Sequence, residues 1–228
     1  MRRFADEAAL TAALATEIIA SVEDAQRAGR TASLLVSGGR SPTALFDKLS
    51  GTEIDWSRIW VGLADERWID PTSSDSNEHL LRQHLLRQSA ANANFAGLKN
   101  DAATPAAGAA ASWQSIARMP RPFDYVVLGM GEDGHTASLF PKSPGLGKAL
   151  DARQAPGCVA MTAPVEPSAR LSLNLSALLS ARHVALLLIG SDKWNTYDRA
   201  RKAGSVEEMP VRALLRQQQV PVTVYWAP

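Results

Sequence analysis

The feature that most constrains the fold of this chain is a regular alternation between two residue patterns. Residues 6–27 are rich in alanine and carry apolar side chains four positions apart, at Leu10, Leu14, Ile18 and Val22. This spacing predicts a helix, and we expect further helices over residues 41–49, 77–88 and 104–119. Short apolar runs that predict strands lie at residues 33–36, 59–64, 123–128, 159–162, 183–189 and 222–226. Such alternation is typical of an α/β fold with a mostly parallel sheet and helices on both faces.

Length and charge narrow the class of protein. The 228 residues favour one domain, residues 1–228, because nothing in the sequence resembles a linker. With 24 basic and 23 acidic residues, the chain lacks the basic field that nucleic-acid binding requires, so we expect no nucleic-acid partner. Acidic residues interrupt the N-terminal segment and no apolar run reaches membrane-spanning length, which predicts a soluble cytoplasmic protein without membrane contact. The sequence leaves the oligomeric state open, a monomer included.

Cysteine content limits the chemistry further. Cys158 is the only cysteine, so an internal disulfide and a thiolate metal cluster are both excluded. We expect Cys158 to be a small apolar residue on a strand.

Four of the predicted strands run into polar or glycine-rich turns. These turns begin at Ser37, Asp65, Gly129 and Gly190. If the four strands are parallel, the four turns share the carboxyl edge of the sheet, where open α/β sheets bind their ligands.

The turn over residues 129–141 carries the most specific signal. It matches the dinucleotide-binding pattern G-x-G-x-x-G at Gly129, Gly131 and Gly134. Glu132 and Asp133 would place negative charge against a pyrophosphate, however, and prolines soon afterwards cut short any following helix. We therefore interpret the glycines as allowing a tight turn that presents Asp133 beside His135. A neighbouring carboxylate fixes the tautomer of an imidazole and raises its basicity, so His135 is a candidate general base. The other three histidines are expected to be structural.

A second group of residues fits an anion. The backbone amides of Gly38 and Gly39 precede a predicted helix and are suited to bind a phosphate, although an ordinary tight turn explains them as well. Arg170 offers a planar fork for phosphate oxygens and Lys193 a mobile point charge. Either could instead be a solvated surface cation. If they converge on the glycine turn, they would neutralise a phosphate dianion.

The charged residues after the strand at 59–64 have two interpretations. Asp65, Glu66 and Arg67 are consistent with a surface ion pair of little energetic consequence. Their position at the shared edge favours a function. The sequence contains no Gly-x-Ser-x-Gly motif, so it does not indicate a serine nucleophile. No second histidine stands at metal-ligand spacing from His135, so we expect no metal site.

Together these motifs resemble those of the 6-phosphogluconolactonase family. The matching segments are residues 37–39, 65–68, 129–141 and 170–173, in the order typical of the family and across essentially the whole chain. Arg40, Ser172 and the pair Val165–Glu166 depart from its usual residues. The resemblance implies a Rossmann-like fold, no cofactor, and 6-phospho-D-glucono-1,5-lactone as the substrate, hydrolysed in the second step of the oxidative pentose phosphate pathway.

One mechanism fits these residues, and two rival functions stay open. In our hypothesis His135, oriented by Asp133 or Asp65, takes a proton from the water that attacks C1 of the lactone. Arg67 stabilises the carbonyl oxygen or contacts a sugar hydroxyl. The first rival is an aldose–ketose isomerase or a deaminase that acts on an amino-sugar phosphate. Glucosamine-6-phosphate deaminase, which has the same fold family, carries a glutamate where this chain has Phe140 and an aromatic residue in place of Arg67. The second rival is a sugar-phosphate sensor that binds but does not catalyse.

Overall fold

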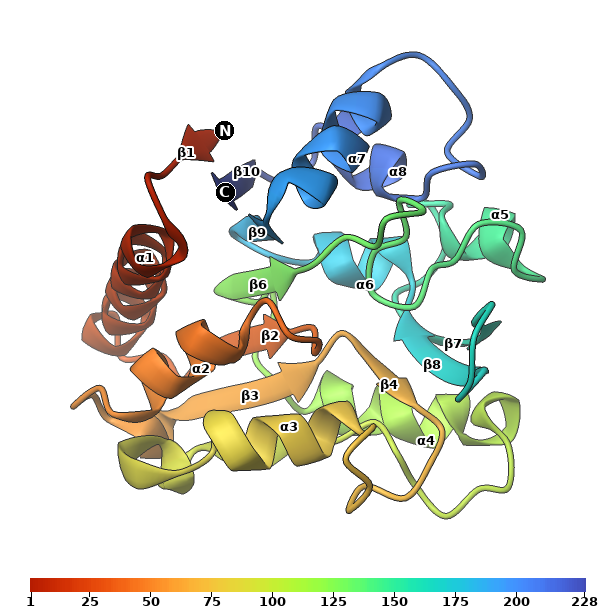
Figure 1. Cartoon of the computed structure of the whole chain (residues 1–228). Coiled ribbons are helices and arrows are strands. Elements are labelled where there is room, and N and C mark those ends of the chain that lie inside the picture. Colours follow the sequence, from red (N-terminus) through yellow and green to blue (C-terminus); the bar gives the residue numbers. More distant parts are fainter.

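A computed structural model, which describes residues 1–228, contains a seven-stranded main sheet in which every neighbouring pair of strands is parallel. Its strands, in spatial order, are β1 (Arg2–Arg3), β10 (Val222–Ala227), β9 (Val184–Ile189), β6 (Tyr125–Leu128), β2 (Ala32–Val36), β3 (Ile59–Leu63) and β5 (Asn94–Ala96). The pairing of β1 with β10 brings the two ends of the chain side by side (Figure 1). The predicted α/β fold with a mostly parallel sheet is confirmed.

A second, three-stranded antiparallel sheet lies beyond the arrowheads of β2 and β3 in Figure 1. It consists of β4 (Asp65–Arg67), β8 (Ala169–Leu173) and β7 (Cys158–Thr162). The sequence predicts a turn at residues 65–67 and no strand at 169–173, and both predictions are wrong. Ala64 is the switch point: its N–H donates to Val36 O in the main sheet, and its carbonyl accepts from Leu173 N in the second. A strand as short and charged as β4 forms because it pairs with β8, which is distant in the sequence. No local residue pattern predicts such a strand.

Helices cover both faces of the main sheet. Their bounds are α1 (Glu7–Arg27), α2 (Thr43–Ser50), α3 (Asn77–His84), α4 (Pro105–Ala117), α5 (Leu146–Ala149), α6 (Leu175–Leu179), α7 (Ser191–Arg201) and α8 (Val211–Arg216), with 3₁₀ turns η1 (Trp56–Arg58) and η2 (Gln88–Asn92). The first three helices pack side by side on one face (Figure 1). The connections that contain α4, α6, α7 and α8 return in the opposite direction and, with the usual right-handed crossover, cover the other face. None of the helices combines the length and the apolar composition needed to cross a bilayer.

Helix ends follow the local sequence with two exceptions. Asp6 caps α1 by accepting from Ala9 N at 2.7 Å, and Thr104 caps α4 by accepting from Ala107 N at 3.2 Å. The helix expected over 41–49 begins later, at Thr43: a turn from Arg40 to Thr43 comes first, and Pro42 stands at the N-cap without a side-chain hydrogen bond. The helix expected over 77–88 ends at His84.

The main sheet lies in a continuous core of 58 buried residues. Residues 184–188 of β9 are all buried, as expected of a central strand covered on both faces. The strands β9, β6, β2 and β3 are neighbours and parallel, so their carboxyl ends lie along one edge. The predicted convergence at this edge is confirmed for the turns after β9, β6 and β2, whereas residues 65–67 reach the edge as strand β4. Cys158 begins β7, and burial raises the pKa of its thiol to about 12, so it is un-ionised at neutral pH.

Candidate active site

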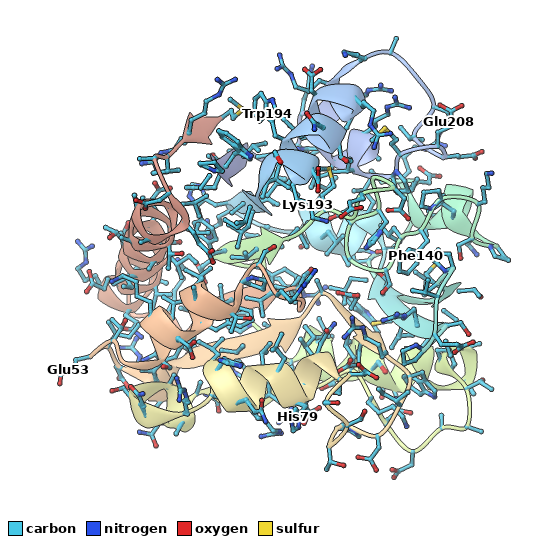
Figure 2. All side chains as sticks on the ribbon, viewed as in Figure 1. Glu53, His79, Phe140, Lys193, Trp194 and Glu208 are labelled. Carbon is cyan, nitrogen blue, oxygen red and sulfur yellow. The ribbon has the colours of Figure 1, made fainter.

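A cavity of about 330 Å³ opens at this carboxyl edge. Its walls come from the turns after β2 and β6, from β4 and β8, and from the start of α7. Seven of the eight residues singled out from the sequence line it, namely Gly38, Gly39, Asp65, Arg67, His135, Arg170 and Lys193. Figure 2 marks two of the lining side chains, Lys193 at the base of α7 and Phe140 beside the second sheet. The eighth residue, Asp133, does not line the cavity but contacts His135.

His135 is held by Asp133. Its Nδ1 lies 2.6 Å from Asp133 Oδ1, which also accepts from the backbone N–H of His135 at 3.0 Å. Burial alone would raise the pKa of Asp133, but the hydrogen bond from the imidazole, its charge and the backbone N–H groups outweigh burial and hold the pKa below its ordinary range. Asp133 is therefore ionised at neutral pH and can only accept. The proton of the neutral ring then sits on Nδ1, which leaves the lone pair of Nε2 free to act as a base.

The glycine loop that carries this pair is braced by the C-terminal helices. Gly134 adopts a left-handed φ of +82° and packs against Met209, and its carbonyl accepts from Val211 N at 2.9 Å. Arg199 donates to the carbonyl of Glu132 at 2.9 Å. The loop thus has fixed supports on both sides of Asp133.

Asp65 has a different partner. Its carboxylate is 7% exposed and accepts from Ser138 Oγ at 2.6 Å, with no hydrogen bond to His135. The sequence left open which carboxylate orients His135. In the structure Asp133 makes the contact, while Asp65 forms part of the cavity wall.

Two arginines face the cavity from the second sheet. Arg67 and Arg170 are directly opposite each other in the β4–β8 pairing. Arg170 is 5% exposed and its Nε–H has no hydrogen-bond partner. Burial, and then the charge of Arg67, lower the pKa of the Arg170 guanidinium. A buried donor without a partner next to a second cation is costly by itself, so this wall is suited to an anionic ligand.

The turn after β2 forms a further part of the cavity wall. Gly39 has a φ of +97°, a conformation that glycine adopts without strain. Ser37 Oγ, at the start of this turn, is a second buried polar atom without a partner. Lys193, in the first turn of α7, lines the same cavity.

The sequence predicted no positioning role for two residues that line the cavity, Phe140 and Asn77. The ring of Phe140 packs on the His135 imidazole with 4.4 Å between centroids, and the guanidinium of Arg170 lies 5.9 Å from the same ring. Asn77, the first residue of α3, accepts a hydrogen bond from Arg67 at 3.1 Å. No local pattern marks Asn77, because its contact with Arg67 depends on how α3 docks against β4.

Comparison with known proteins assigns the family. Residues 5–226 match the model of the family described as glucosamine-6-phosphate isomerases/6-phosphogluconolactonase. The chain belongs to this family. A 6-phosphogluconolactonase of Pseudomonas aeruginosa is 44% identical over 215 residues, 94% of this chain and 89% of the relative. One from Rhizobium meliloti is 42% identical over 228 residues, 100% of this chain and 98% of the relative.

A solved structure agrees with these relatives. The crystal structure of a 6-phosphogluconolactonase from Shewanella baltica is 44% identical and superposes with a TM-score of 0.95, covering 100% of this chain and 97% of that chain. The resemblance drawn from the motifs of the sequence is thereby confirmed, and so is the Rossmann-like α/β fold that it implied.

The family's glycine loop gives the first testable prediction. A Cβ at Gly131 would occupy the space of the His135 ring, whereas a Cβ at Gly129 would meet no atom within 4 Å. Gly131→Ala should therefore displace His135 from Asp133 and cost about 1–3 kcal/mol of unfolding free energy, the usual range for overpacking. Side-chain NMR should report a changed His135 signal in Gly131→Ala and an unchanged one in the control Gly129→Ala. An unchanged signal in both variants would contradict this description of the loop.

Proposed function

We propose that this chain hydrolyses 6-phospho-D-glucono-1,5-lactone to 6-phospho-D-gluconate, the second step of the oxidative pentose phosphate pathway. The observation that carries the proposal is the 44% identity, over 94% of the chain, to a protein named 6-phosphogluconolactonase. The geometry supports it independently, because one cavity contains an oriented imidazole and a cationic wall. We further propose that residues 1–228 act as one domain in the cytoplasm, with the sugar-phosphate lactone as the partner.

His135 supplies the base in this mechanism. Its Nε2 takes a proton from a water molecule as the water attacks C1, and the ionised Asp133 stabilises the imidazolium that forms. The ring C1–O bond then breaks and its oxygen takes the proton from the His135 imidazolium, which gives the open acid and restores the neutral imidazole. A strained ester of this kind needs a positioned base and a stabilised carbonyl oxygen, so the mechanism includes no cofactor.

The substrate's phosphate would occupy the cationic end of the cavity. The backbone amides of Gly38 and Gly39, the unpaired Arg170 Nε–H and the Lys193 ammonium are its proposed contacts. Arg67, beside Arg170, would stabilise negative charge on the carbonyl oxygen or bind a sugar hydroxyl. Asp65, which lines the cavity from the same strand as Arg67, completes the set.

Removing the base tests the chemical step. His135→Ala should lower kcat for the lactone by roughly two to four orders of magnitude, the usual contribution of general-base catalysis. Binding of 6-phosphogluconate should survive. His84→Ala is the matched control, because His84 Nδ1 also pairs with an aspartate, Asp47 at 2.9 Å, but lies outside the cavity. Near-normal turnover by His135→Ala would remove His135 from the mechanism and make Asp65 the candidate base. A wild type that binds the product without any turnover would favour the sensor.

Removing the buried arginine tests the phosphate site. Arg170→Ala should weaken 6-phosphogluconate binding by about 1.5–3 kcal/mol, the range for a hydrogen bond to a charged group. Calorimetry measures this loss, and Arg153→Ala, an exposed arginine paired with Asp151, serves as the control. Hydrolysis of non-phosphorylated gluconolactone should be poor in the wild type and change little in the variant. Equal losses on both lactones would assign Arg170 to the fold or the chemistry instead.

The deaminase that shares this fold family provides the last comparison. Deamination of glucosamine 6-phosphate needs acid–base groups at the sugar oxygen and at C2, and Phe140 cannot titrate. We therefore expect no ammonia release from glucosamine 6-phosphate under conditions where the lactone is hydrolysed well above its background rate. Protein-dependent ammonia release that Asp65→Asn abolishes would overturn the lactonase proposal in favour of the deaminase.

A further inference from the structure

Asn77 occupies a junction between three parts of the cavity wall. It is the first residue of α3, its side chain lines the cavity, and it is 2% exposed. Its Nδ2 donates to the carbonyl of Asp65 at 2.8 Å, and its Oδ1 accepts from Arg67 Nη1 at 3.1 Å. The same amide fills the space that a Cβ at Gly38 would need. One side chain therefore contacts the backbone of β4 at Asp65, the guanidinium of Arg67 and the turn at Gly38.

The orientation of this amide is chemically determined. A backbone carbonyl only accepts, so the group facing Asp65 O must be the Nδ2 donor. A guanidinium only donates, so the group facing Arg67 must be the Oδ1 acceptor. Asparagine meets both demands at once, whereas a carboxylate lacks the donor and an apolar side chain lacks both groups.

Asn77 holds one half of the Arg67 fork. Arg67 Nη1 donates to Asn77 Oδ1 and to the carbonyl of Asp75 at 2.6 Å, which uses both of its hydrogens. The Nε and Nη2 groups of Arg67 make no hydrogen bond to the protein, and Arg67 lines the cavity. The held half fixes the plane of the guanidinium, and the free half remains available to a substrate oxygen.

A buried carboxylate places Asn77 beside Arg67. Glu66 is 1% exposed, and its two oxygens accept from Arg67 N, Ser76 Oγ, Asn77 N and Glu78 N at 2.7–3.0 Å. Burial raises the pKa of Glu66, while these four hydrogen bonds favour its ionised form. All four partners are donors, one from β4 and three from the N-terminus of α3, where a negative charge is favourable. The carboxylate therefore joins α3 to β4 next to the contact between Asn77 and Arg67.

We propose that Asn77 is the positioning residue of Arg67: it fixes the guanidinium plane while leaving the charge of Arg67 uncompensated for the substrate. This inference rests on the proposed lactone hydrolysis, in which Arg67 contacts the substrate. Arg170 stands opposite Arg67 in the β4–β8 pairing, so the two like charges repel and Arg67 needs a partner to stay at the wall. Asn77 Oδ1, a neutral acceptor, supplies that partner together with the carbonyl of Asp75. An aspartate in its place would offset the positive charge that attracts an anionic ligand.

A double-mutant cycle tests this coupling. Asn77→Ala and Arg67→Ala should each lower kcat/KM for the lactone by roughly 10- to 100-fold, as expected for lost hydrogen bonds to a charged group. The double variant should fall within about twofold of Arg67→Ala, since Asn77 acts through Arg67. Asn94→Ala is the matched control: its Nδ2 also donates to a backbone carbonyl, Ser57 O at 2.9 Å, but it lies outside the cavity. Losses that multiply in the double variant, or near-normal activity of Asn77→Ala, would overturn the proposal.

Two further measurements keep the test independent of folding and of the proposed reaction. Asn77→Asp keeps the size of the side chain, and we expect it to bind 6-phosphogluconate more weakly than the wild type. Equal or tighter binding would contradict the role of a neutral acceptor.

In a crystal structure of ligand-free Asn77→Ala, Arg67 should leave its place at the wall, and an unmoved Arg67 would refute the positioning role. A wild type without lactone hydrolysis would refute the proposed function, while the Arg67 position would still decide the role of Asn77.

Discussion

The parallel pairing of β9, β6, β2 and β3 is the constraint on which the site depends. Parallel neighbours end at the same edge of a sheet, so residues that are far apart in the sequence meet there. His135 follows β6, Gly38 and Gly39 follow β2, and Lys193 follows β9. The second sheet begins where β3 ends, at Ala64, and adds Arg67 and Arg170 as a further wall. A slip of any one of these strands would move its residues out of the cavity.

Charges at this edge are buried to different degrees and are stabilised in different ways. Glu66 lies beneath the wall and satisfies both oxygens with protein donors, so it acts as a structural tie between β4 and α3. Asp133 is compensated by the imidazole that it orients. Arg170, by contrast, is buried with its Nε–H unpaired. An unpaired buried donor costs about 1–3 kcal/mol. An anion that accepts from the Arg170 Nε–H would remove this cost, so the arrangement favours anion binding.

The sequence predicted most of what local patterns can encode. Periodicity located α1 and the central strands, and the glycine loop identified the pair of Asp133 and His135. It could not predict the second sheet, because β4 has three residues and pairs with a strand about one hundred positions away. Likewise, Asp65 lines the same cavity as His135 and Asp133 precedes it by two residues, and only side-chain geometry distinguishes the carboxylate that bonds to it. Asn77 was missed for the same reason, since its role arises from the docking of α3.

We propose that the cavity has a polarity, with phosphate at Arg170 and Lys193 and the reacting carbonyl at His135. A crystal structure of the protein with 6-phosphogluconate would locate both ends of the ligand. Phosphate oxygens should lie on the amides of Gly38 and Gly39 and on the two cations. The C1 carboxylate should then lie about 3 Å from His135 Nε2, or be joined to it by one water molecule. A phosphate bound against His135, or a ligand bound outside the cavity, would refute this polarity.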